Sequence, residues 1–143
     1  MDDDRDEARL FSVEEVNELI PRLELIMERL QSRSVELRES LEQLAAESGQ
    51  PTSDLEVAHL VRRWPDKREL LDDLQTLVCQ IDECGGQFKG LDLGLVDFPA
   101  EIEGEIGLLC WQYGEKEVQH WHPLDGGFNG RKPLPKGREM YLQ

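Results

Sequence analysis

The chain has 143 residues, and its 31 acidic against 16 basic side chains give a net charge of −15. This length fits one domain, and a surface this acidic is repelled by phosphate backbones and anionic lipid, so we expect neither nucleic acid nor a membrane as a partner. The acidic start differs from a secretion signal, no apolar run has the ~18 residues of a membrane span, and three cysteines show no paired spacing. The sequence therefore predicts a cytoplasmic protein with reduced thiols.

A long helix is predicted directly after a charged leader, residues 1–9, which we expect to be disordered. Ser12 and Glu15 have the spacing of a capping box at a helix start. The apolar residues that follow alternate steps of three and four, which predicts a helix over 13–47 with a kink at Pro21. They are Val13, Val16, Ile20, Leu23, Met27, Leu30, Leu37, Leu41 and Leu44.

A second helix is predicted over 66–84, where Leu70, Leu74, Leu77 and Ile81 repeat the same spacing. Two glycines at 85 and 86 end it. Residues 54–65 are ambiguous, with a helical apolar face that Pro65 interrupts. Helices 13–47 and 66–84 are expected to run antiparallel as a coiled-coil-like hairpin over 12–85, and their heptad seam favours a homodimer as partner arrangement.

After residue 86 the apolar period changes from 3.6 to 2, which is typical of strands. Short strands are predicted at 87–89, 95–98, 105–113 and 117–122, giving a β-meander over 86–123. The fold class is thus α+β, a long antiparallel helical hairpin followed by a small three- to four-stranded antiparallel sheet. We expect a single α+β domain over 10–130 and a flexible basic tail over 131–143.

The pairing of the last two strands decides which side chains share a face. A turn over 114–117 would set Trp111 opposite His120 and Leu109 opposite His122. One face would then carry Trp111, Tyr113, His120 and His122, as a candidate pocket or dimer surface. The other face, with Leu108, Cys110 and Trp121, would be the core beneath the helices.

Several polar residues are candidates for chemistry. His120 and His122 lie two apart on one strand, close to Asp125, so they are a weak candidate metal site. Asp97 lies in an apolar strand and needs a partner, for which Arg131 is available. That carboxylate belongs either to a structural ion pair or to a pocket.

Six motifs resemble the prokaryotic domain-of-unknown-function family 2203. They lie at residues 11–17, 19–23, 94–100, 109–111, 121–128 and 130–133, in the family's order. The resemblance implies a small cytosolic protein of bacteria or archaea, and it carries over no catalytic residue because the family has no established activity. Members are expected to have an aromatic residue, usually tyrosine, where His120 stands, which weakens a two-histidine metal site and favours His122 as the functional residue. The candidate ligand-binding residues within the motifs are Asp97, Trp111, His122, Asp125 and Arg131.

Three functions remain open. The favoured one is an interaction or scaffold protein that self-associates through helices 13–47 and 66–84, without a cofactor. The second is a small-ligand-binding protein or enzyme, in which His122 is the general acid or base, oriented by Asp97 or Asp125. Arg131 would hold an anionic group and Trp111 would form a wall. The third is metal binding through His120 and His122.

Overall fold

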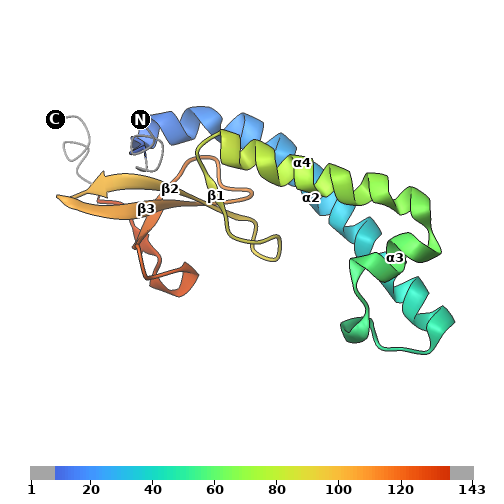
Figure 1. The fold of residues 1–143 in the computed structure, drawn as a ribbon. Coiled ribbons are helices and arrows are strands. Elements are labelled where there is room, and N and C mark those ends of the chain that lie inside the picture. Colours follow the sequence, from blue (N-terminus) through green and yellow to red (C-terminus); the bar gives the residue numbers. More distant parts are fainter. Residues whose placement is uncertain (1–8, 136–143) are drawn as a thin grey trace, which may run out of the picture. The chain divides into compact units, whose positions relative to one another are not determined.

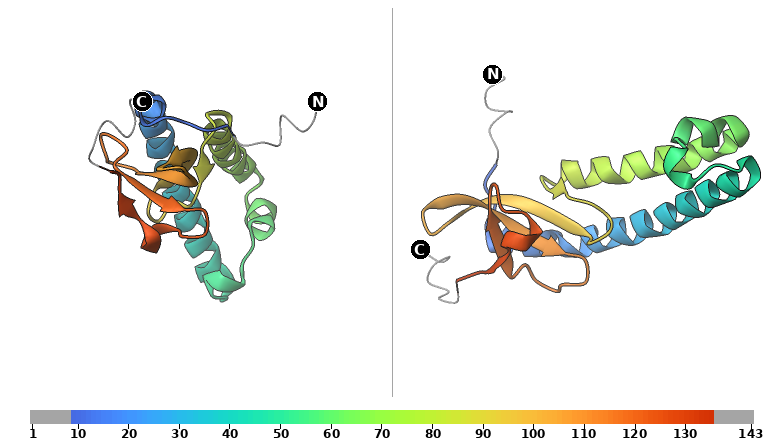
Figure 2. Two further views of the ribbon diagram at one scale, coloured as in Figure 1. Left: turned by 90° about the vertical axis from the view of Figure 1, so that its left-hand side faces the viewer. Right: turned by 90° about the horizontal axis from the view of Figure 1, so that it is seen from below.

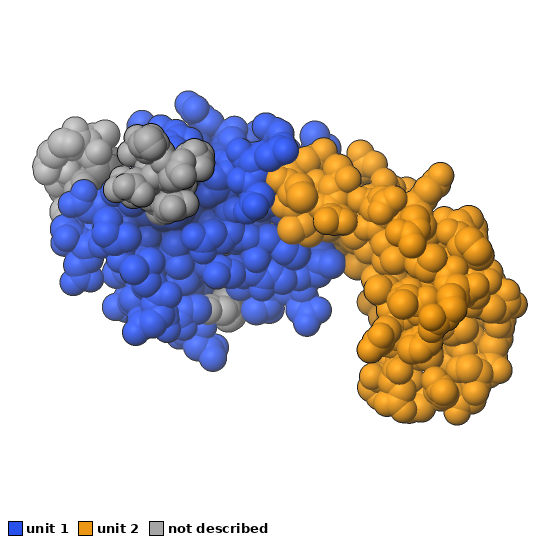
Figure 3. All heavy atoms as spheres, viewed as in Figure 1, with its two compact units in different colours: residues 1–25, 81–143 blue, residues 26–80 orange. Residues whose placement is uncertain are grey.

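The computed structural model describes residues 9–135, which form two compact units (Figure 3). Residues up to 25 and from 81 onward make the first unit, and residues 26–80 make the second. The predicted disordered leader, apart from residue 9, and the tail from 136 onward lie outside the described residues.

Helix α2 (Val13–Ser48) begins at the predicted capping box. The Glu15 amide donates to Ser12 Oγ (3.0 Å), and the Ser12 amide donates to Glu15 Oε1 (2.9 Å). Pro21 lies inside the helix, which continues through it. Gly49 follows the last turn with a φ of 74°, a backbone conformation that glycine adopts without strain.

The unit of residues 26–80 is a helical hairpin (Figures 1 and 2). After α2 come η1 (Thr52–Asp54), α3 (Val57–Arg63), η2 (Pro65–Lys67) and α4 (Arg68–Glu83). Three ion pairs join Arg33 to Asp73, Glu36 to Lys67 and Glu47 to Arg63. Their order reverses along the chain, so the two arms are antiparallel, as predicted. Within the described residues, no helix combines the length and apolar character needed to cross a membrane.

The other unit contains a five-stranded antiparallel sheet, ordered β1-β2-β3-β4-β5, which confirms the α+β class with one strand more than predicted. The strands are β1 (Gln87–Phe88), β2 (Leu95–Ile102), β3 (Glu105–Gln112), β4 (His120–Pro123) and β5 (Lys132–Pro133), with η3 (Phe128–Gly130) before the last. Strand β5 lies in the segment expected to be a tail.

The predicted pairing of β3 with β4 is wrong by one residue. His122 lies opposite Leu108, and Leu109 lies opposite Trp121. A slip of one residue moves every side chain of a strand to the other face. The register was predicted wrongly because it assumed a tight turn over 114–117, whereas residues 113–119 form a longer loop held by hydrogen bonds.

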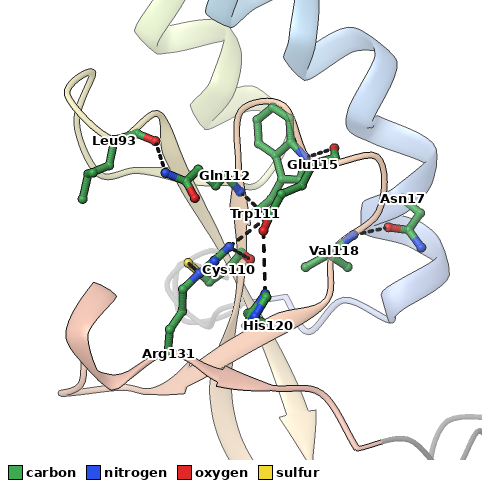
Figure 4. Close-up of polar contacts among 9 residues, drawn as sticks. All are labelled: Asn17, Leu93, Cys110, Trp111, Gln112, Glu115, Val118, His120 and Arg131. Carbon is green, nitrogen blue, oxygen red and sulfur yellow. Dashed lines mark hydrogen bonds and ion pairs between the residues drawn. The ribbon is translucent and has the colours of Figure 1, made fainter.

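Three side chains, those of Trp111, Glu115 and Asn17, organise that loop (Figure 4). The Glu115 carboxylate accepts from the Gln112 amide (2.7 Å), and the Glu115 carbonyl accepts from the Trp111 indole N–H (2.9 Å). The Val118 amide donates to the side-chain oxygen of Asn17 on α2 (2.8 Å). Because of these bonds, the loop does not adopt the tight hairpin turn predicted over 114–117.

The sheet has two faces, which we call inner and outer. The inner face carries Val96, Phe98, Leu109 and Trp111, which are fully buried, and Phe98 meets the ring of Phe11 just before α2, at 5.1 Å between centroids. The outer face carries the alternate residues, namely Leu95, Asp97, Leu108, Cys110 and His122. Trp111, predicted to share a pocket with His122, therefore lies on the opposite face.

Candidate functional site

The centre of the outer face is a buried pair of ionisable side chains. His122 Nε2 lies 2.9 Å from Asp97 Oδ2. Asp97 comes from β2 and His122 from β4, and the central strand β3 holds both in register. Only 1% of Asp97 and 3% of His122 is exposed. Such groups are almost never buried without a specific partner, so each depends on the other.

The second ring nitrogen of His122 is also held in place. Nδ1 lies 2.8 Å from the Pro123 carbonyl and 3.2 Å from the Gly127 amide. With a proton on Nδ1 the ring donates to the carbonyl, and without it the ring accepts from the amide. The loop after β4 therefore fixes the orientation of the imidazole in either tautomer.

Cys110 completes the cluster from β3. Its sulfur, one Asp97 oxygen and one His122 nitrogen all lie within 4.8 Å of one another. Burial raises the pKa of the Cys110 thiol to about 11, and the charge of Asp97 acts in the same direction, whereas the hydrogen bond from Arg131 opposes them. The thiol is therefore neutral at pH 7 in this form of the protein.

Arg131 reaches the site through Cys110 (Figure 4). Its Nε donates to Cys110 Sγ (3.3 Å), and a terminal nitrogen contacts both the Cys110 carbonyl (3.2 Å) and Glu115 Oε1 (2.8 Å). Burial opposes the charge of Arg131, but its hydrogen bonds with Cys110 and Glu115 outweigh burial and raise its pKa. The structure thus gives Asp97 a histidine as partner, where the sequence indicated this arginine.

A pocket of about 450 Å³ opens above the pair. Asp97 and His122 form its floor because they are its most buried polar residues. Leu93 and Leu124 at the rim are 45% and 63% exposed. Asp125, a predicted site residue, lies exposed among the lining residues. The full lining is Lys89, Leu93, Leu95, Asp97, Leu108, His122, Leu124, Asp125, Gly126 and Gly127.

One oxygen in the pair is left without a partner. Asp97 Oδ1 is buried and accepts no hydrogen bond from any of the described residues. An unsatisfied buried acceptor of this kind costs about 1–3 kcal/mol, and more for a charged group. The atom therefore marks a place for a donor or a cation.

His120 does not join this cluster. Its Nδ1 lies 3.7 Å from Glu115, and the group of metal-ligating side chains in the described residues contains Cys110 in its place. The sequence analysis did not identify Cys110 or Glu115 as residues of the site. The signal for Cys110 was its position opposite Asp97, which only the correct strand register reveals.

The fold and site define a small α+β protein with a helical hairpin and a five-stranded sheet whose outer face holds a polar cluster. A family model described as "uncharacterized conserved protein (DUF2203)" matches residues 9–134. The chain belongs to this family, which confirms the resemblance seen in its motifs. No curated protein and no solved structure matches the chain.

Proposed function

We propose that the protein binds a small ligand in the pocket on the outer face of the sheet, through Asp97 and His122. The observation that carries this proposal is the burial of an ionisable pair at the floor of an open pocket. Pairs of this kind rarely add stability over apolar residues, so their presence beside a cavity favours a binding role. The pocket volume is in the range typical of small-molecule sites.

The lining indicates what such a ligand is like. The apolar walls of the pocket are formed by Leu93, Leu95, Leu108 and Leu124. Leu93 and Leu124 are exposed to solvent at the rim, where an apolar side chain is unfavourable unless something covers it. The floor offers a carboxylate oxygen that has no hydrogen-bond partner among residues 9–135. We therefore expect a ligand with an apolar body and one group that donates a hydrogen bond or carries positive charge.

The test is a thermal-melt screen of the full chain against amines, organic acids, nucleotides, sugar phosphates and divalent metals. A ligand at 100 times its dissociation constant stabilises by about 2.7 kcal/mol, which raises the melting temperature by several degrees. The shift should vanish in Asp97→Asn and persist in Asp92→Asn, which changes an exposed carboxylate outside the pocket lining. An equal shift in both variants would contradict the proposal.

We also propose self-association through the unit of residues 26–80. Its supporting observation is an apolar pocket of about 490 Å³ lined by Val57, Ala58, Val61, Pro65 and Leu71, with Arg62 and Arg68 beside them. Val57 is 47% exposed. Acidic side chains on a second copy can pair locally with these arginines.

Light scattering across a wide concentration range tests this second proposal. The wild type should form dimers as concentration rises, and Val57→Glu should remain monomeric. Ile106→Glu is the matched control, because Ile106 has the same 47% exposure but lies in the other unit. A wild type that is monomeric throughout would refute self-association.

A further inference from the structure

In one tautomer of His122, two acceptors face each other beside Asp97. When His122 Nδ1 carries a proton, it donates to the Pro123 carbonyl, 2.8 Å away. The lone pair of Nε2 then points at Asp97 Oδ2, 2.9 Å away. Two acceptors at this distance repel each other unless a proton or a metal ion lies between them.

We propose that Asp97, Cys110 and His122 bind a divalent transition-metal ion of the zinc class, with an open coordination position facing the pocket. This inference rests on the proposed ligand site and names the ion at its floor. Asp97 Oδ1, buried and unpartnered, is a further oxygen available to the ion. This set shares His122 with the pair His120 and His122 predicted from the sequence, and it has Asp97 and Cys110 in place of His120.

The geometry fits such an ion. In a tetrahedral zinc site the ligand atoms lie roughly 3.3–3.7 Å apart, given bond lengths of about 2.0–2.3 Å. The three side chains already lie within 4.8 Å of one another, so rotamer adjustments of about an ångström would close them on a metal. Three protein ligands and one open position are typical of zinc sites that act on a bound molecule.

The chemistry of the donors selects the metal. Sulfur and imidazole nitrogen favour zinc and its neighbours over magnesium or calcium, which prefer oxygen. When the ion binds, the Cys110 thiol releases its proton to solvent and becomes a thiolate. One thiolate and one carboxylate then neutralise the divalent charge, so the buried centre carries no net charge and needs no further counterion.

The surrounding residues also fit a metal centre. Histidine ligands usually donate their other ring N–H to a carbonyl, as Nδ1 is placed to do with Pro123. Arg131 Nε lies 3.3 Å from Cys110 Sγ and can donate to a metal-bound thiolate. Its own charge is matched by Glu115 at 2.8 Å. The guanidinium therefore stabilises the sulfur ligand while its repulsion of the cation is reduced.

Cobalt is the probe for the experiment. The full chain, untagged and stripped of metal by a chelator, is titrated with Co²⁺ while its absorption spectrum is recorded. We expect one ion per chain, with a thiolate-to-cobalt charge-transfer band that Zn²⁺ abolishes by displacement. Cys110→Ser should lose the band, whereas Cys79→Ser, which alters an exposed cysteine, should keep it.

A second variant guards against a folding defect in Cys110→Ser. Asp97→Asn keeps the thiol and nearly the same shape, and it should weaken Co²⁺ binding at least tenfold with an unchanged circular dichroism spectrum. Absence of the band in the wild type, or a band that survives Cys110→Ser, would overturn the metal assignment. Small molecules that still bind in an Asp97-dependent way would then leave the proposed function standing. If Co²⁺ binds as expected and no small molecule does, the metal assignment stands and the proposed small-ligand function is wrong.

Discussion

The two faces of the sheet are built from the same strands and both contain buried side chains, yet those side chains differ in kind. Val96 is 0% exposed and points inward, and its neighbour Asp97 is 1% exposed and points outward. The buried side chains of the inner face are apolar, whereas those of the outer face include an acid, a thiol and an imidazole. Burial alone therefore does not separate core from site, and the chemistry of alternate residues does.

The difference also has an energetic side. Burial of the inner-face side chains stabilises the fold through apolar area removed from water. Burial of the outer-face pair costs desolvation free energy, which is offset only by a favourable interaction between the two partners. Substitutions on the inner face should thus change mainly the free energy of unfolding. Substitutions on the outer face should change mainly the affinity for ligand and metal.

The largest stability loss is expected from Trp111→Ala on the inner face. Removing this fully buried side chain should cost about 3–5 kcal/mol, because a cavity replaces it and the indole bond to the Glu115 carbonyl is lost. Urea denaturation measures the change, with Trp111→Phe as a milder control. A loss below about 1 kcal/mol would mean that this face is not the core.

On the outer face, Asp97→Ala should cost about 3 kcal/mol, because it leaves His122 buried without its partner. The double variant Asp97→Leu with His122→Leu should regain stability to within about 1 kcal/mol of the wild type, since apolar pairs often replace buried ion pairs without loss. It should also lose all ligand and metal binding. A double variant as unstable as Asp97→Ala would show that the pair serves the fold.

Gly86→Ala is expected to cost about 1–3 kcal/mol by overpacking the inner face. Its new Cβ would lie 2.6 Å from Val96 Cγ1 and 2.9 Å from Phe98 Cζ. Gly130→Ala, which meets no atom within 4 Å, is the control and should change little. Cobalt affinity should be unchanged in both variants, and a large change in Gly86→Ala would mean that the faces are coupled.

The start of α2 gives a smaller effect. Ser12→Ala removes the helix cap and should cost about 1 kcal/mol. Because the cap positions Phe11 against Phe98, the loss concerns the inner face only. Chemical denaturation should detect it, and a concurrent loss of cobalt binding would count against independent faces.

The smallest effect is a pH dependence at the same cap. The hydrogen bond from the Ser12 amide holds the pKa of Glu15 below its ordinary value of 4.5, against the opposing effect of desolvation. The stability from the ionised cap is therefore present at neutral pH and lost as the pH falls from about that value through the lowered pKa. The melting-temperature difference between wild type and Glu15→Gln should shrink on acidification. A difference that grows would contradict this assignment.

Much of the fold was predictable because local signals carry it. The capping box at Ser12, the heptad spacing and the change of period after residue 86 each predicted an element that the structure contains. The short strand β5 was not predictable, since two residues, Lys132 and Pro133, hold too little pattern and depend on pairing with β4.

The site was predictable only in part, for the same reason. Asp97 stood out as an acid in an apolar strand, and His122 as a histidine within a motif. Their meeting with Cys110 depends on strand register, which a seven-residue loop with side-chain hydrogen bonds controls. The sequence reading assumed a tight turn, and a one-residue slip exchanged Trp111 for Cys110 as the neighbour of His122.

The most direct test of the outer-face site is a crystal structure of the full chain grown with zinc, with anomalous data collected at the zinc edge. We expect one peak between Asp97, Cys110 Sγ and His122 Nε2, with an open coordination position toward the pocket. A crystal structure without that peak, or one with zinc bound only by exposed residues elsewhere, would contradict the metal assignment.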